Sequence, residues 1–169
     1  MKNIIGIARI VFGSIFLWAF FDKLIGLGYS TCRDPKSMEV IRGCEKAWIS
    51  GGSPTEGFLK FGTHGPFALF YQSLSGNILI DMLFMIGLLF IGVALVLGIG
   101  MKITTYSGVL LMILMWSSLL PPENHPIVDD HIIYAFLFLI LNYINAGDIL
   151  GFGKHWKKNG LGKKYSALV

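Results

Sequence analysis

Charged side chains are scarce in this sequence. Asp, Glu, Lys and Arg make up 14% of its 169 residues, whereas a soluble globular domain carries roughly 25%. Hydrophobic residues make up 54% of the chain. This composition excludes an ordinary soluble domain and indicates an integral membrane protein, with membrane lipid as its first expected partner.

Familiar cofactor motifs are also missing. The sequence has no Cys-x-x-Cys-His for covalent haem, no Gly-x-Gly-x-x-Gly and no P-loop. Its four histidines do not pair at the spacing of intramembrane haem ligands. Asp81 and the run Asp129-Asp130-His131 contain metal-ligand types, but at an unspecific spacing. We therefore expect neither haem nor a metal.

Four apolar runs fill most of the chain, at about residues 4–25, 77–98, 103–120 and 129–145. A helix needs about 20 residues to cross the hydrocarbon of a bilayer, and each run is close to that length, the last only marginally. The pattern predicts an all-α membrane protein with one domain, a bundle of four transmembrane helices. Residues 26–76 would form a cap on it, and residues 146–169 a tail.

The lysines predict the orientation. Five follow the fourth run, while the loop between the third and fourth runs has no Lys or Arg. By the positive-inside rule both termini are cytoplasmic, and the first and third loops face the exoplasmic side of the plasma membrane. This placement accounts for the net charge of +4, so we expect no nucleic acid as a partner. The five lysines are Lys154, Lys157, Lys158, Lys163 and Lys164.

The two cysteines, Cys32 and Cys44, both lie in the first loop, on the predicted exoplasmic side. An oxidising compartment permits a disulfide between them. A structural staple is the favoured interpretation, because the spacing is far from Cys-x-x-Cys. A redox-active pair stays open as the alternative.

The first loop is too long to lack structure of its own. Met38–Ile49 alternates apolar and charged residues at roughly helical spacing. Ser53-Pro54-Thr55-Glu56 matches a capping box, with Ser53 as the N-cap of a short helix over residues 54–61. The aromatic stretch 67–74 suits a membrane interface. We expect two or three short helices lying over the outer end of the bundle.

Folding the four runs into a bundle brings ionisable residues to this outer end. Each has a structural explanation: Asp129 or Asp130 as an N-cap, Lys23 reaching the headgroups, His131 as an interfacial histidine. Helix capping alone does not require so many ionisable residues at one depth, so a functional site is favoured over a structural network. Its candidate members are Asp22, Lys23, Asp81, Asp129, Asp130 and His131, with His64 and His125 above them. Arg9 stands apart near the cytoplasmic side, either reaching lipid phosphate or pairing inside the bundle.

Four stretches resemble the DoxX/DoxD-like membrane protein family, and the similarity covers nearly the whole chain. Residues 9–24, RIVFGSIFLWAFFDKL, have the early Arg and the closing Asp-Lys. Residues 48–59, WISGGSPTEGFL, and 147–156, GDILGFGKHW, are similar to segments of the DoxD-like branch and of the C-terminal end. The strongest match is residues 121–134, PPENHPIVDDHIIY.

The resemblance implies a membrane redox protein like the thiosulfate:quinone oxidoreductase subunit. Such an enzyme oxidises thiosulfate to tetrathionate at the outer face and reduces membrane quinone. The polar residues that match the family are Arg9, Asp22, Lys23, Asp129, Asp130 and His131. With Asp81, which the topology places beside them, the expected catalytic residues are Asp22, Lys23, Asp81, Asp129, Asp130 and His131. The small sulfur anion would contact Lys23, His64 and His125, with Arg9 as a further substrate-binding candidate.

Two other classes remain. The chain is alternatively a non-catalytic anchor or assembly subunit of a redox complex, with its cap as a docking surface for a second subunit or another copy. A small solute carrier fits less well, because the sequence shows no internal repeat and no pair of broken helices.

Overall fold

The computed structural model describes residues 2–34 and 37–158, which contain helices and no strands. Two isolated β-bridges, Arg33–Val40 and His64–Leu119, are the only strand-like pairings in this part of the chain. Four helices are long: α1 (Lys2–Ile25), α3 (Ile78–Leu97), α4 (Met101–Ser118) and α5 (Asp130–Tyr143). The short ones are η1 (Trp48–Ser50), η2 (Phe58–Gly62), α2 (Ala68–Ser73), η3 (Ala146–Asp148) and α6 (Gly153–Lys158).

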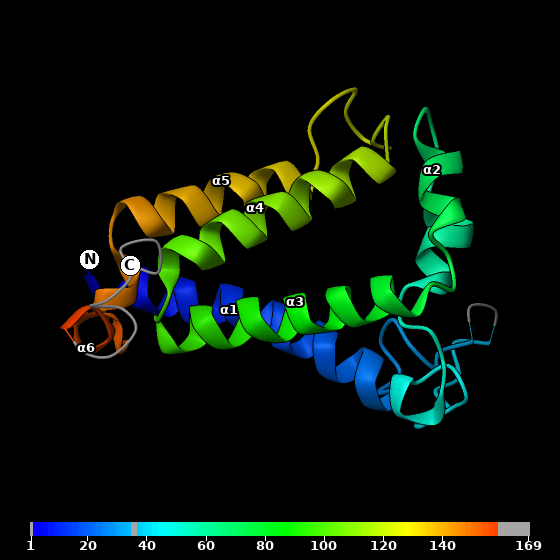
Figure 1. Ribbon diagram of the computed structural model, residues 1–169, viewed down its shortest axis with the longest axis horizontal. Coiled ribbons are helices and arrows are strands. Elements are labelled where there is room, and N and C mark those ends of the chain that lie inside the picture. The colour runs from blue at the N-terminus through cyan, green and yellow to red at the C-terminus, as the bar shows by residue number, and fades with distance from the viewer. Residues whose placement is uncertain (1, 35–36, 159–169) are drawn as a thin grey trace.

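The long helices form two pairs, α1 with α3 and α4 with α5 (Figure 1). Small residues allow the close approach within each pair. A Cβ at Gly13 of α1 would lie 2.8 Å from the Cβ of Leu95 in α3. In the other pair, a Cβ at Gly108 would lie 2.3 Å from the ring of Phe138. Glycine at such crossings is typical of helices that associate in membranes.

The two pairs diverge along the molecule. They meet where the turn Gly98–Gly100 joins α3 to α4, and they separate toward the opposite end, where α2 runs across between them (Figure 1). We call the end at the turn, where α1 begins and α6 lies, the terminal end. The other is the cap end, formed by the described residues of 26–76 and the loop 119–129.

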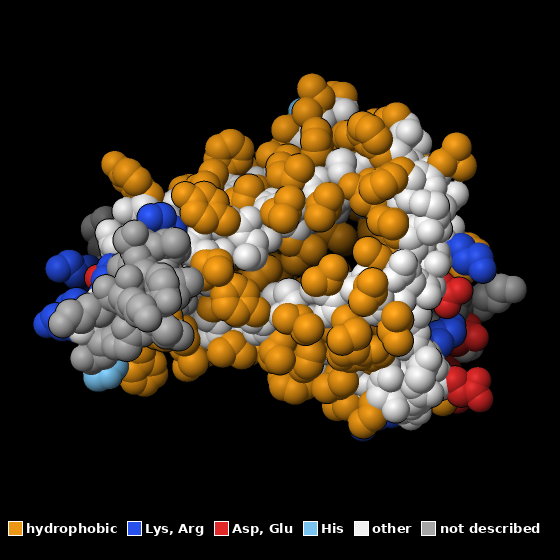
Figure 2. All heavy atoms as spheres, viewed as in Figure 1, with side chains coloured by type: hydrophobic (Ala, Val, Ile, Leu, Met, Phe, Trp, Pro, Cys, Tyr) orange, Lys and Arg blue, Asp and Glu red, His pale blue; other side chains and the backbone are white. Residues whose placement is uncertain are grey.

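Apolar side chains cover the middle of the face drawn in Figure 2, whereas charged side chains gather at its two ends. Leu83, Leu110 and Phe136 are more than half exposed in the middle of three different helices. By length and composition α1 and α3 are able to cross a membrane. Helix α5 has 14 residues, fewer than the ~20 that span a bilayer without help.

The cap differs in part from its prediction. The expected helix over Met38–Ile49 is wrong: residues 38–47 form irregular turns and the bridge at Val40, and only Trp48–Ser50 is helical. A left-handed Met38 (φ 59°) and Gly43 (φ 68°) are incompatible with a helix there. One of the two capping-box hydrogen bonds is present, since the Glu56 amide donates to Ser53 Oγ at 3.1 Å. The Glu56 carboxylate pairs with Lys60 instead of reaching back to the Ser53 amide. Lys163 and Lys164 lie outside the described residues.

The predicted disulfide between Cys32 and Cys44 is confirmed. Replacing both cysteines by serine should weaken the cap by about 2–3 kcal/mol, because the bridge limits the entropy of the opened loop. The check is limited trypsin digestion, which should cut faster at Arg33, Arg42 and Lys46, while thermal unfolding of the helices changes little. Wild-type protein treated with a reductant is the control and should digest like the variant. An unchanged cleavage rate in both would contradict a stapling role.

Candidate functional site

Asp22, in the last turn of α1, is 1% exposed and organises the start of the cap. Its carboxylate accepts hydrogen bonds from the amides of Tyr29, Ser30 and Thr31 at 2.9–3.0 Å. The Ser30 hydroxyl adds a fourth bond at 2.7 Å. A buried carboxylate is stable only with such partners, so Asp22 fixes the turn that follows α1.

Asp81, one turn into α3, does the same for the second half of the cap. One carboxylate oxygen accepts from the hydroxyls of Ser53 at 2.9 Å and Thr55 at 2.6 Å. It also accepts from the Thr55 amide at 3.2 Å. The sequence indicated Ser53 as an N-cap but gave no sign that its hydroxyl donates to a residue 28 positions away.

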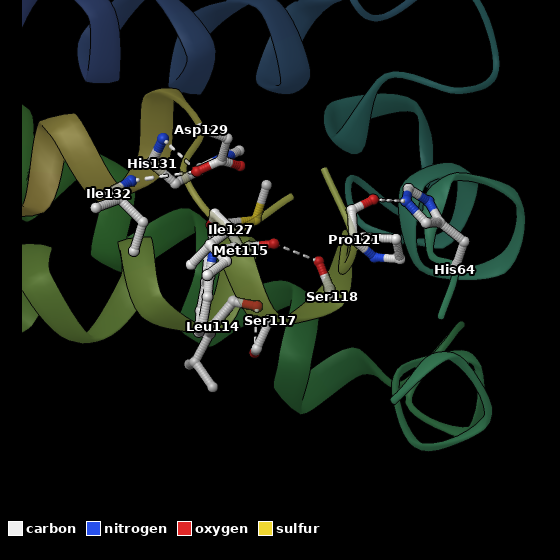
Figure 3. Close-up of polar contacts among 11 residues, drawn as sticks. His64, Leu114, Met115, Ser117, Ser118, Pro121, Ile127, Asp129, His131 and Ile132 are labelled. Carbon is white, nitrogen blue, oxygen red and sulfur yellow. Dashed lines mark hydrogen bonds and ion pairs between the residues drawn. The ribbon is translucent and has the colours of Figure 1, made fainter. Parts of the chain in front are cut away.

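Asp129 is the N-cap of α5, as expected for one of the two adjacent acids. Its Oδ1 accepts from the amides of His131 and Ile132 at 3.0 and 3.2 Å. Its Oδ2 lies 2.8 Å from Nδ1 of His131 (Figure 3). This contact orients the imidazole and leaves its Nε2 without a protein partner among the described residues. Asp130 is exposed and makes no such contact.

His64 and His125 hold loops together. His64 Nε2 lies 3.1 Å from the carbonyl oxygen of Pro121, and its amide donates to Ser118 at 3.1 Å. Figure 3 shows His64 and the Asp129–His131 pair on opposite sides of the end of α4. His125 Nδ1 accepts the amides of Ile127 and Val128 at 3.1 and 2.9 Å. The structure therefore does not bring His64 and His131 together.

The contacts of His64 belong to a strap, which we define as residues 58–74. At its far end the Tyr71 hydroxyl lies 2.6 Å from the Ser117 hydroxyl in the last turn of α4. The strap thus joins α4 to the start of α3 across the divergent end of the two helix pairs (Figure 1).

Lys23 and His131 occupy matching positions on the two helix pairs. The rings of Phe16 in α1 and Phe138 in α5 lie 5.5 Å apart. Lys23 follows Phe16 by seven residues and His131 precedes Phe138 by seven. Seven residues are almost two helical turns, so each polar residue shares the face of its phenylalanine, about 10 Å nearer the cap end. Both side chains are half-buried.

Lys23 makes no ion pair or hydrogen bond with another described residue, and its Nζ lies 5.8 Å from the centre of the Phe84 ring. Deeper between the pairs, the ring of Phe12 makes edge-to-face contacts with those of Tyr134 and Phe138, at centroid distances of 5.3 and 4.8 Å. We call the space between the helix pairs, with this aromatic floor and with Lys23 and His131 at its cap end, the seam. Figure 2 shows a hollow between α3 and α4, lined by apolar side chains.

Tyr134 was not singled out from the sequence. It is half-buried, and its hydroxyl makes no hydrogen bond with another described residue. The available signal was its position three residues after His131, which places both on one face of α5.

Arg9 lies at the terminal end, away from the other candidates. It is fully buried, and its guanidinium donates to the carbonyls of Leu95 and Val96 at the end of α3. It also donates to Ile149 and Leu150, at 3.0 and 2.9 Å. Arg9 therefore joins α1, α3 and the segment after η3.

No group of three or more metal-ligand side chains occurs in residues 2–34 and 37–158. Comparison with family models, curated proteins and solved structures gives no match. The resemblance to DoxX/DoxD-like proteins accordingly stays a prediction.

Proposed function

We propose that this chain is an integral membrane protein whose four long helices all cross the bilayer, with the cap end on the exoplasmic side. The apolar belt of Figure 2 and the charges at both ends support this placement. Helix α5 is the shortest of the four, so Asp130 at its start lies at the outer membrane surface, near the apolar loop residues Ile127 and Val128, which are 61% and 38% exposed. The orientation rests on the lysine distribution.

Within that frame, the seam is a site for a membrane quinone. It is apolar and aromatic along its length, it opens laterally between α3 and α4, and it has two nitrogen donors at its cap end. A quinone head group needs this combination, because its ring is apolar and its two carbonyl oxygens accept hydrogen bonds. The arrangement of Lys23 and His131 on facing helices carries the proposal.

The reaction is the transfer of two electrons from a sulfur oxyanion to the quinone. Two thiosulfate ions form one sulfur–sulfur bond and give tetrathionate and two electrons, and the quinone takes up these electrons with two protons. His131 supplies a proton from Nε2, with Asp129 stabilising the charged imidazole through Nδ1. The Lys23 ammonium stabilises negative charge that develops on a quinone oxygen in the dry seam.

The other acids then have positioning roles. Asp22 and Asp81 hold the two halves of the cap over the seam through seven hydrogen bonds from cap residues. Exposed Asp130 exchanges protons between the outer solution and its neighbour His131.

The test is thiosulfate-dependent reduction of a short-chain quinone by the purified protein in nanodiscs. Lys23→Met and His131→Gln should each lower the rate at least tenfold, as expected for loss of one electrostatic or acid–base group. Asp130→Asn should lower it less. Lys60→Met, which removes an exposed lysine of the cap, is the matched control and should leave the rate unchanged.

A folded wild-type protein without activity would sink the oxidoreductase proposal. The anchor function would then be preferred, because Phe61, Leu69 and Phe70 on the strap are 80%, 82% and 59% exposed and offer an apolar surface to a partner subunit. Activity that survives both Lys23→Met and His131→Gln would keep the reaction and remove the seam as its site.

A further inference from the structure

The first turn of the cap encloses a second hollow, separate from the seam. It is an open depression of about 450 Å³ on the exoplasmic side of α1, close to the end of that helix. Two arginines face into it from a wall that is otherwise backbone, apolar or aromatic. Its lining residues are Leu27, Gly28, Tyr29, Arg33, Val40 and Arg42.

The hollow is built by covalent and hydrogen-bonded constraints. The turn at Tyr29 is fixed by the Asp22 carboxylate. On the opposite wall the Cys32–Cys44 disulfide joins the two segments that carry the arginines, and the Ile41 amide donates to the Cys32 carbonyl at 3.0 Å. Gly28 (φ 89°) closes the wall, because a Cβ there would lie 2.1 Å from Val40.

The side chains that line the hollow include two positive charges and no negative charge. Arg33 Nε donates to the Gly28 carbonyl at 2.8 Å, and its guanidinium carbon lies 5.7 Å from the centre of the Tyr29 ring. These contacts fix the plane of the guanidinium and leave its terminal nitrogens available. Among the described residues, no carboxylate lies within 4.0 Å of a nitrogen of Arg33 or Arg42.

We infer that this hollow binds a small divalent oxyanion, with Arg33 as the oriented bidentate donor and Arg42 as the second positive charge. A planar guanidinium matches two oxygens of a sulfonate-like or phosphate-like group. The identification of that anion as thiosulfate rests on the proposed function, whereas oxyanion binding itself does not. The donor would then dock in the cap beside α1, and Lys23 would serve the quinone.

The same chemistry would recognise the phosphate of a lipid headgroup, so the experiment separates the two sources. Thiosulfate and sulfate are titrated by calorimetry into the protein in maltoside micelles free of phospholipid, with no quinone present. Chloride at matched ionic strength is the reference. Trp18, whose ring lies 5.0 Å from that of Tyr29, provides a fluorescence signal beside the hollow.

Both dianions should bind, and the double variant Arg33→Gln, Arg42→Gln should weaken binding at least tenfold. The single variant Arg42→Gln replaces an exposed side chain, so it should fold like the wild type, and it should weaken binding severalfold. Lys60→Gln is the matched control and should bind like the wild type.

Binding that is unaffected in both arginine variants, or that chloride equals, would overturn the proposal. So would an absence of dianion binding in micelles combined with arginine-dependent retention of anionic phospholipid, which would assign the hollow to headgroups. Because calorimetry measures binding alone, its result is compared with that of the separate quinone-reduction assay: oxyanion binding by a protein that does not reduce quinone would reject the proposed function and keep the site. Quinone reduction by a protein whose oxyanion binding does not depend on the two arginines would keep the proposed function and reject the site.

Discussion

Replacing Arg9 by methionine is expected to lower the free energy of unfolding by at least about 3 kcal/mol, the largest effect of any single substitution considered. Its guanidinium satisfies four backbone carbonyls, two at the end of α3 and two in the segment after η3. Hydrogen bonds to charged groups contribute roughly 1.5–3 kcal/mol each, and the substitution removes one buried and three part-buried hydrogen bonds of this kind. Methionine fills much of the space, so the loss measures the hydrogen bonds rather than a cavity.

The measurement is reversible unfolding in mixed micelles with increasing sodium dodecyl sulfate, followed by far-ultraviolet circular dichroism. Lys2→Met, at an exposed position in the same helix, should unfold like the wild type. Arg9→Lys should recover less than half of the loss, because one ammonium cannot reach four carbonyls on two segments. If Arg9→Met is as stable as the wild type and loses thiosulfate activity instead, Arg9 belongs to substrate binding, as the sequence first suggested.

The long helices were predictable because composition and length act locally. The runs at 4–25, 77–98 and 103–120 differ from α1, α3 and α4 by at most two residues at either end. The fourth helix begins at Asp130, as expected for an N-cap at Asp129. The cap was harder, because alternating apolar and charged residues at 38–49 mimic a helix. The disulfide and left-handed residues impose turns instead.

The sequence predicted at which end of the bundle the acidic residues lie, but not which groups their carboxylates contact. Topology alone brings Asp22, Asp81 and Asp129 to the cap end, yet each carboxylate is occupied by hydrogen bonds that depend on loop geometry. That Lys23 and His131 lie on the faces of α1 and α5 that meet at Phe16 and Phe138 follows only once this ring contact is known. Sequence periodicity predicts which residues share one face of a helix, whereas the element that packs against this face depends on the tertiary structure.

The adjacent residues Asp22 and Lys23 should give opposite results when they are substituted. Asp22→Asn should destabilise the cap by about 2–4 kcal/mol, because an amide nitrogen would replace one of two oxygens that receive four hydrogen bonds. Trypsin should then cut faster at Arg33 and Arg42, since local opening of the turn exposes them. Oxyanion binding should fall in parallel, because the same turn forms one wall of the hollow.

Lys23→Met should leave proteolysis and oxyanion binding unchanged and should affect only quinone reduction, since Lys23 makes no hydrogen bond or ion pair with another described residue. A methionine retains contact with the Phe84 ring, so the cost in packing is small. The two variants, at neighbouring positions in the last turn of α1, are compared by the rate of cap proteolysis and the rate of quinone reduction. Should Lys23→Met open the cap, or Asp22→Asn reduce quinone turnover with the cap intact, the roles assigned to this acid and this lysine would have to be exchanged.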